Sequence, residues 1–198
     1  MLFRSISIFS EADQNYILEW EVMKNFTSDR ELKISCSKKR VSQEKKKVWK
    51  ETTSSTGATK KTLMKEVSHE SIVYEVEFYS RNESALKDLR MEYLIYYEQS
   101  QQAFGRPEAE QKILNGEIPI PLIECRKKTS VATNPVEILS DNINAQKKNK
   151  DGDMLIGGAG EVHGFRARLY MKDSSGKEIM RSFSYPTKLS EKKFPWKS

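Results

Sequence analysis

The alternation of apolar and polar residues is clearest in two segments between residues 72 and 97. A polar stretch, residues 80–88, separates them. One face of these segments carries Ile72, Tyr74, Val76 and Phe78, and then Leu89, Met91, Tyr93, Ile95 and Tyr97. A period of two predicts β-strands, so we expect residues 72–79 and 89–97 to be antiparallel neighbours. Because each strand has one apolar face, a second layer must cover it, which favours a sandwich.

The same alternation predicts further strands along the chain. Residues 17–23 place Leu18, Trp20 and Val22 on one face, and we expect Trp20 in the shared core. Other predicted strands are residues 31–37, 127–132, 134–139, 162–171 and 177–185, of which the last two form a hairpin around an Asp/Ser/Gly turn. Pro119 and Pro121 restrict residues 118–125 to a sheet edge or to a crossing between sheets.

Short strands separated by turns, with no segment favouring a helix, predict an all-β fold and an antiparallel β-sandwich. We expect one domain over residues 16–187. An arm, residues 1–15, precedes it as a short lead strand or a disordered segment. A basic tail, residues 188–198, follows and is mobile unless Trp196 docks. Residues 140–160 are rich in Asp, Asn, Lys and Gly and predict a flexible loop.

A basic insertion over about residues 38–67 differs from the rest of the chain. Residues 38–50 hold seven basic residues and one acidic residue. Residues 45–53 and 59–67 are predicted to be the arms of a hairpin with its tip at 54–57, because their Thr-rich sequence favours strands. This hairpin has too little apolar surface for a core element, so we expect it to be long and to protrude.

Composition limits the possible classes of protein. Of 198 residues, 37% are hydrophobic and 31% charged, with a formal net charge of +6, and the mean hydropathy is −0.70. No window reaches the roughly 18 apolar residues that predict a membrane span. Arg4, Ser5 and Ser7 interrupt the apolar start, which makes it a poor signal peptide. The protein is therefore either cytosolic or an exported form whose signal peptide is absent from this sequence.

The residues that could carry chemistry form no recognisable constellation. Cys36 and Cys125 lie on apolar positions and are expected to be buried free thiols, with a disulfide between them as the less favoured alternative. His69 and His163 lack zinc-ligand spacing. Residues 157–160 lack the Lys-Ser/Thr of a phosphate-binding loop, and residues 151–153 lack the further oxygens of a calcium loop. We expect no catalytic residue, metal or cofactor.

The basic insertion supplies the positive functional signal. Its candidate polyanion-binding residues are Lys38, Lys39, Arg40, Lys45, Lys46, Lys47, Trp49 and Lys50. Their charges could bind phosphates or sulfated glycans, and the tryptophan could stack on a base or sugar. The alternative interpretation is a solvated hairpin whose lysines prevent edge-to-edge aggregation.

Two hairpin patterns resemble a known family. The succession Val76, Phe78, Asn82, Ser84, Leu86, Leu89, Met91, Tyr93, Ile95 and Tyr97 is similar to the B–C hairpin of bacterial immunoglobulin-like (fibronectin III-like) domains. The run from Phe165 through Gly176 to Phe183, closed by Pro186, resembles their final F–G hairpin. The resemblance covers about residues 60–187, and the insertion at 31–67 departs from a minimal domain of this type.

Such domains occur in small exported surface and pilus-associated proteins of planctomycetes and verrucomicrobia. The resemblance implies an exported (periplasmic, outer-membrane-associated or extracellular), non-enzymatic protein that acts in cell-surface binding, adhesion or assembly with a protein or glycan partner. It carries over no catalytic residue. The second hypothesis is a polyanion or nucleic-acid-binding module that uses residues 38–50. A small hydrolase is the third hypothesis, because the sequence contains no recognisable set of catalytic residues.

Overall fold

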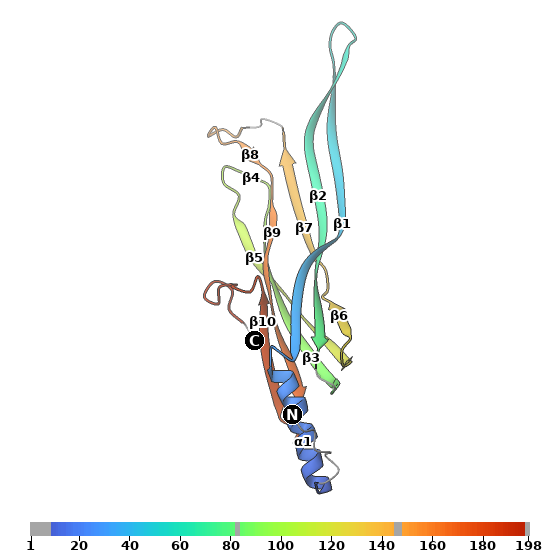
Figure 1. The fold of residues 1–198 in the computed structure, drawn as a ribbon. Helices are drawn as coiled ribbons and strands as arrows, with labels where there is room; N and C mark the ends of the chain where they lie inside the picture. Colours follow the sequence, from blue (N-terminus) through green and yellow to red (C-terminus); the bar gives the residue numbers. More distant parts are fainter. Residues whose placement is uncertain (1–8, 82–83, 145–147, 197–198) are drawn as a thin grey trace.

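The computed structural model describes residues 9–81, 84–144 and 148–196 (Figure 1). Over these residues one helix precedes ten strands, so the all-β prediction is confirmed apart from that helix. The elements are α1 (Glu11–Thr27), β1 (Leu32–Thr53), β2 (Thr59–Ser80), β3 (Leu86–Ser100), β4 (Ala103–Phe104), β5 (Ala109–Ile123), β6 (Lys128–Ala132), β7 (Val136–Ile143), β8 (Leu155–Ile156), β9 (Gly160–Lys172) and β10 (Glu178–Tyr185).

The strands form two four-stranded antiparallel sheets and one small pair. In sheet A, β2 pairs with β1, β6 and β7, and in sheet B the order is β10-β9-β3-β5. The short strands β4 and β8 pair with each other. The core contains fully buried side chains from both sheets, including Tyr74, Phe78, Tyr93, Ile95, Phe165 and Leu169. It therefore lies between the two layers.

The predicted pairing of residues 72–79 with 89–97 is wrong, because these segments belong to different sheets. Tyr74 lies on β2 in sheet A, whereas Tyr93 lies on β3 and pairs with Gly116 and Ala167 in sheet B. The predicted faces are correct, since both tyrosines are buried in the core. The two apolar faces oppose each other across the core. The predicted hairpin of residues 162–171 and 177–185 is confirmed by the register of β9 and β10.

Residues 17–23, predicted as a strand, lie in helix α1, as do residues 11–15 of the predicted N-terminal arm. Residues 1–8 of that arm lie outside the described residues. Ser10 caps the helix by accepting a hydrogen bond from the Asp13 backbone N–H at 3.2 Å. Val22, Met23 and Phe26 lie at helical spacing and pack against the core. Trp20, predicted in the core, is 53% exposed.

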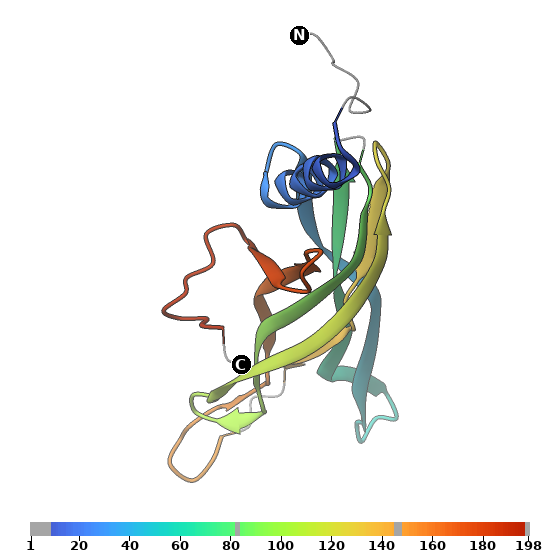
Figure 2. The same ribbon diagram turned by 90° about the horizontal axis from the view of Figure 1, so that it is seen from below.

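The end of α1 is fixed to the sandwich by buried polar contacts. The Asn25 side-chain amide donates to the Ser80 Oγ and to the Ser84 carbonyl, both at 3.0 Å. Arg181 of β10 donates to the Phe26 carbonyl at 2.8 Å. Figure 2, viewed from the helix end, shows α1 beside the sheets rather than between them. The C-terminal turn of α1 is thus anchored to the sandwich.

The edge position predicted for the segment of Pro119 and the strand predicted at residues 127–132 are both confirmed. Pro119 lies on β5, at the edge of sheet B, and residues 128–132 form β6, at an edge of sheet A. The predicted loop at 140–160 is wrong in part, because β7 continues to Ile143 and β8 falls within it. Residues 145–147 of that loop lie outside the described residues, as does Asn82 of the family resemblance.

The C-terminal segment packs on sheet B. This is the alternative in which Trp196 docks. Leu189 and Phe194 pack on Leu94 and Tyr96, on the face of sheet B that points away from the core. The Tyr96 hydroxyl donates to the Pro195 carbonyl at 2.7 Å. The Arg168 guanidinium lies 4.2 Å from the Trp196 ring centroid. This segment therefore covers apolar surface that the sheet would otherwise expose.

Candidate functional site

The hairpin of β1 and β2 is the candidate site. The two strands pair from Leu32–Ser80 to Thr53–Thr59, and residues 54–58 form the turn. The Ser54 backbone N–H donates to the Ala58 carbonyl at 2.9 Å to close this turn. Pairing of β2 with β7 ends where Lys65 meets Ile143. Residues 45–65 are named here the distal hairpin. Its residues 49–64 project past the end of β7 (Figure 1), whereas Lys45, Lys46 and Lys47 lie opposite residues 66–68, which still pair with β7.

The hairpin carries the excess positive charge of the protein. Residues 38–67 contain ten basic and three acidic residues, while the whole chain has a net charge of +6. The remainder of the chain is therefore close to neutral. Because opposite charges from other elements are scarce near a projecting tip, the potential there is positive.

The structure separates the predicted binding residues into two groups. Lys38, Lys39 and Arg40 lie on the part of β1 that covers the sandwich. The Lys38 ammonium donates to the Val162 carbonyl at 3.4 Å, Lys39 pairs with Glu75, and Arg40 Nε lies 3.3 Å from Glu70 Oε2. Lys39 and Arg40 are therefore neutralised by carboxylates of the sandwich. Lys38 has no ion pair within the described residues, but its hydrogen bond holds it against the body, and we remove all three from the candidate site.

The distal residues are less constrained. Lys45 Nζ lies 3.7 Å from Glu66 Oε1, a long ion pair. Within the described residues, Lys46, Lys47 and Lys50 have no ion pair, and Trp49 is 52% exposed. Alternation along the strand puts Lys45 and Lys47 on one face and Lys46 on the other. The distal hairpin therefore offers cations on both faces.

The second arm adds a cation that the sequence prediction did not include. Lys60 lies opposite Thr52 in the register and has no ion pair in the described part of the chain. Lys61 and Lys65, by contrast, pair with Glu51 and Asp141 at 2.8 and 2.9 Å. Alignment of the two predicted arms around the turn would have placed Lys60 near Lys50. We call Lys46, Lys47, Lys50 and Lys60 the unpaired cations of the distal hairpin.

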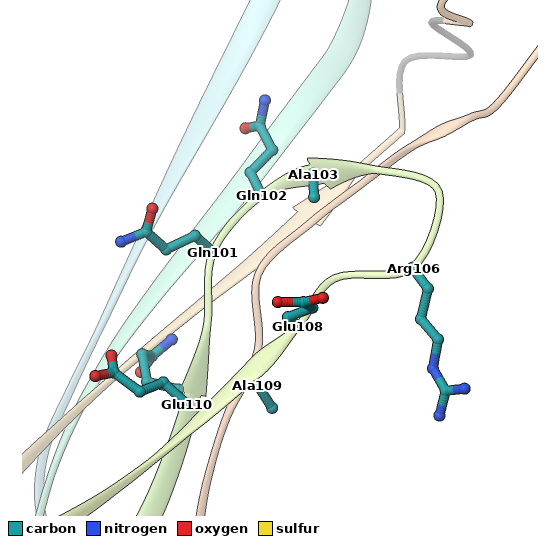
Figure 3. A pocket seen from close by; sticks show the side chains of 8 residues that line it. Gln101, Gln102, Ala103, Arg106, Glu108, Ala109 and Glu110 are labelled. Atoms are coloured by element: carbon teal, nitrogen blue, oxygen red, sulfur yellow. The ribbon is translucent and has the colours of Figure 1, made fainter. Parts of the chain in front are cut away.

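A second candidate is an open depression of about 720 Å³ near the β4–β8 pair. It is lined by Gln99, Gln101, Gln102, Ala103, Arg106, Glu108, Ala109 and Glu110. In Figure 3 the side chains of Gln101, Gln102 and Arg106 point in different directions rather than toward a common point. The depression therefore has no arrangement that would hold a substrate against a reactive group.

The two histidines occupy separate places. His69 Nε2 lies 2.8 Å from Glu137 Oε2 on the exposed face of sheet A. His163 Nε2 lies 3.0 Å from Glu98 Oε2, and its ring centroid is 5.4 Å from that of Phe194. His69 thus has a carboxylate partner, whereas the buried Nε2 of His163 lies near Glu98 without forming a hydrogen bond to the described residues. In the described part of the chain, no three His, Cys, Asp or Glu side chains converge as a metal site would require.

Both cysteines are free thiols, as expected, but their surroundings differ. Cys36 is partly buried on β1 opposite Val76. Cys125 is exposed, so its predicted burial is wrong; it follows the end of β5, where the alternation no longer applies. Burial raises the pKa of the Cys36 thiol to about 12. A raised pKa keeps the thiol protonated, and therefore unreactive, up to higher pH.

Alkylation should distinguish the two thiols. At pH 8 a pKa near 12 leaves roughly one Cys36 thiol in 10,000 ionised. We expect iodoacetamide to modify Cys125 at least about 10-fold faster than Cys36, as followed by peptide mass spectrometry of the native protein. Unfolding in urea should equalise the two rates. Equal rates in the native protein would contradict the burial of Cys36.

Comparison with known proteins gives no family. No family model matches the chain, and no curated protein matches it. One solved structure with some likeness is the X-ray structure of the Northeast Structural Genomics Consortium target SoR45. It is 10% identical, the match covers 79% of this chain and 86% of that chain, and the TM-score is 0.21. At this TM-score the likeness supports no inference about this chain.

Among the described residues, no helix has the length and apolar character needed to cross a membrane.

Proposed function

We propose that this protein is a non-enzymatic binding module whose β-sandwich body presents the distal hairpin to an acidic polymer. The observation that carries the proposal is the projecting hairpin. It bears Lys50, Lys60 and the exposed ring of Trp49, and Lys46 and Lys47 lie at its base. An acidic ligand would supply the counter-charge that the molecule itself does not provide there. Its binding would release counterions, so the affinity would depend strongly on salt.

The body of this module is, in our proposal, an immunoglobulin-like sandwich. Two four-stranded antiparallel sheets with one core between them support this assignment. The exported location and the role in surface binding, adhesion or pilus-associated assembly come from the family resemblance alone. At a cell surface the acidic polymers would be sulfated or otherwise anionic glycans.

Nucleic acid is a second candidate ligand, and the position of Trp49 favours it. The ring is exposed and is followed directly by Lys50, whose ammonium has no ion pair within the described residues. An exposed aromatic ring beside cations is the combination that binds single strands without sequence preference. DNA therefore belongs in the same titration as a glycan.

The test is a titration with heparin and with single-stranded DNA at about 50 and 200 mM salt. If the cations neutralise four phosphates of single-stranded DNA, binding should weaken by roughly 50-fold between these conditions. Combined replacement of Lys45, Lys46 and Lys47 by Ser should flatten the salt dependence and leave the melting temperature nearly unchanged, because these side chains are exposed.

A matched control removes the same charge elsewhere. Lys87, Lys172 and Lys188 are exposed and lie outside the hairpin. Their combined replacement by Ser should leave most of the salt dependence in place. Equal losses in the two triple variants would show that net charge, not the distal hairpin, attracts the polymer. Absence of binding at 50 mM salt would overturn the proposal.

A further inference from the structure

A groove runs between β1 and β10, on the side where both sheets are open. Within the described residues, β1 pairs with β2 alone and β10 pairs with β9 alone. The groove has a volume of about 610 Å³. Its apolar lining is formed by Ile34, Cys36, Phe183 and Tyr185. Both strands that border it therefore have a backbone edge without a strand partner.

The orientation of the β1 backbone follows from its hydrogen bonds. The Arg81 backbone N–H donates to the Glu31 carbonyl at 2.7 Å, so the backbone carbonyl of Glu31 points toward β2. Because the bonds of an antiparallel ladder alternate, the backbone groups of even-numbered residues from 32 onward point to the open edge. The Leu32 carbonyl does so, since it accepts a hydrogen bond from Arg181 of β10 at 3.2 Å.

The next backbone groups along this edge belong to Ile34 and Cys36. Their N–H and C=O groups point away from β2, and in the described part of the chain no strand pairs with β1 on that side. Groups with this spacing are satisfied by the backbone of an added strand. The ligand that this edge fits is therefore an extended polypeptide rather than a small molecule or a sugar.

The side chains beside the edge indicate the composition of that polypeptide. Side chains of the added strand that point inward would meet Phe183 and Tyr185, so they should be apolar. Those that point outward would lie beside Lys33, which has no ion pair in the described structure. The two carboxylates that line the groove, Asp29 and Glu191, are already paired with Arg181 and Arg166. A second copy of this chain would bring an equally basic β1 edge, and like charges on adjacent strands repel. The charges thus favour a different, acidic polypeptide.

We propose that the open edge of β1 over residues 33–38 binds an extended peptide with alternating apolar and acidic residues, which adds antiparallel to sheet A. All the strand pairs of sheet A are antiparallel, and this pairing is the more stable per residue. The site is independent of the distal hairpin, because it uses the backbone of a different part of β1.

The probe is the peptide fluorescein-Glu-Val-Glu-Ile-Glu-Val-Glu-amide, labelled at its N-terminus, and its binding to the wild-type protein is followed by fluorescence anisotropy. In the antiparallel arrangement, the residues whose side chains point inward also direct their N–H groups at β1. N-methylation of the Val and Ile residues should weaken binding at least about 10-fold, since it removes the N–H groups that would donate to β1. N-methylation of the inner Glu residues is the matched control and should leave affinity within about 2-fold.

Amide hydrogen exchange locates the bound peptide. In the free protein, the amides of Ile34 and Cys36 should exchange faster than those of Ser35 and Ser37, which bond to β2. The peptide should slow exchange at Ile34 and Cys36. The triple serine variant at Lys45, Lys46 and Lys47 should retain the affinity, which separates this site from the distal hairpin. Absence of binding at 1 mM peptide, equal effects of the two methylation patterns, or protection confined to residues 45–65 would overturn the proposal.

Discussion

Replacement of Phe165 by alanine should lower the free energy of unfolding by roughly 3–5 kcal/mol. Phe165 is fully buried on β9, near the middle of sheet B. Its ring centroid lies 5.0 Å from that of Tyr74 in sheet A and 6.1 Å from that of Tyr93 in sheet B. The side chain thus contacts both layers, and its loss leaves a cavity where they meet. Urea denaturation followed by tryptophan fluorescence would measure the change.

Trp20→Ala is the control for this experiment. The alternation of residues 17–23 predicted Trp20 in the core, but its side chain is largely exposed on α1. We expect a change in unfolding free energy below about 0.5 kcal/mol, measured by circular dichroism because the substitution removes a fluorophore. A loss under about 1 kcal/mol for Phe165→Ala, or an equal loss for Trp20→Ala, would contradict the described core.

The comparison of these two residues shows what the sequence can predict. The face of a strand is a local property, so alternation placed Tyr74 and Tyr93 correctly in the core. The identity of the neighbouring strand is a non-local property. The polar stretch between β2 and β3 serves equally well as a tight turn or as a connection between layers. Only the structure shows that it connects the two sheets.

The error at α1 has a different physical cause. Residues 17–23 satisfy a period of two, but Val22, Met23 and Phe26 also satisfy helical spacing. A window of seven residues cannot separate these periods. The deciding signal lies outside it, at Ser10 and Asp13, which form an N-terminal cap.

The sequence predicted where the candidate hairpin lies, but not which of its cations are free of ion pairs within the described residues. Residues 38–50 are contiguous and basic, which identified the hairpin. The acids that neutralise Lys39 and Arg40 are Glu75 and Glu70, roughly 30 positions later on β2. Which lysines stay unpaired therefore depends on the register of β1 against β2, and this register is not visible in the charge run.

The second large effect is expected at Gly157, in a segment that the sequence predicted to be a flexible glycine-rich loop. The segment instead packs between the ends of β3 and β7. The Ser100 backbone N–H donates to the Ala159 carbonyl, and the Asp141 N–H donates to the Gly158 carbonyl, both at 2.7 Å. A Cβ atom on Gly157 would lie 1.7 Å from the Asp141 carbonyl oxygen. Glycine is therefore required there by the close approach of two backbones.

Gly157→Ala should cost about 3 kcal/mol of unfolding free energy, at the upper end of the usual range for overpacking, because a backbone oxygen cannot rotate away as a side chain can. Ala159→Ser is the matched control. It changes an exposed neighbour that already carries a Cβ atom, and it should alter stability by less than about 0.5 kcal/mol. Thermal and urea unfolding of both variants would measure these changes. If Gly157→Ala proved as stable as the wild type, residues 157–159 would not be packed against Asp141, and the flexible-loop interpretation would be correct for this segment.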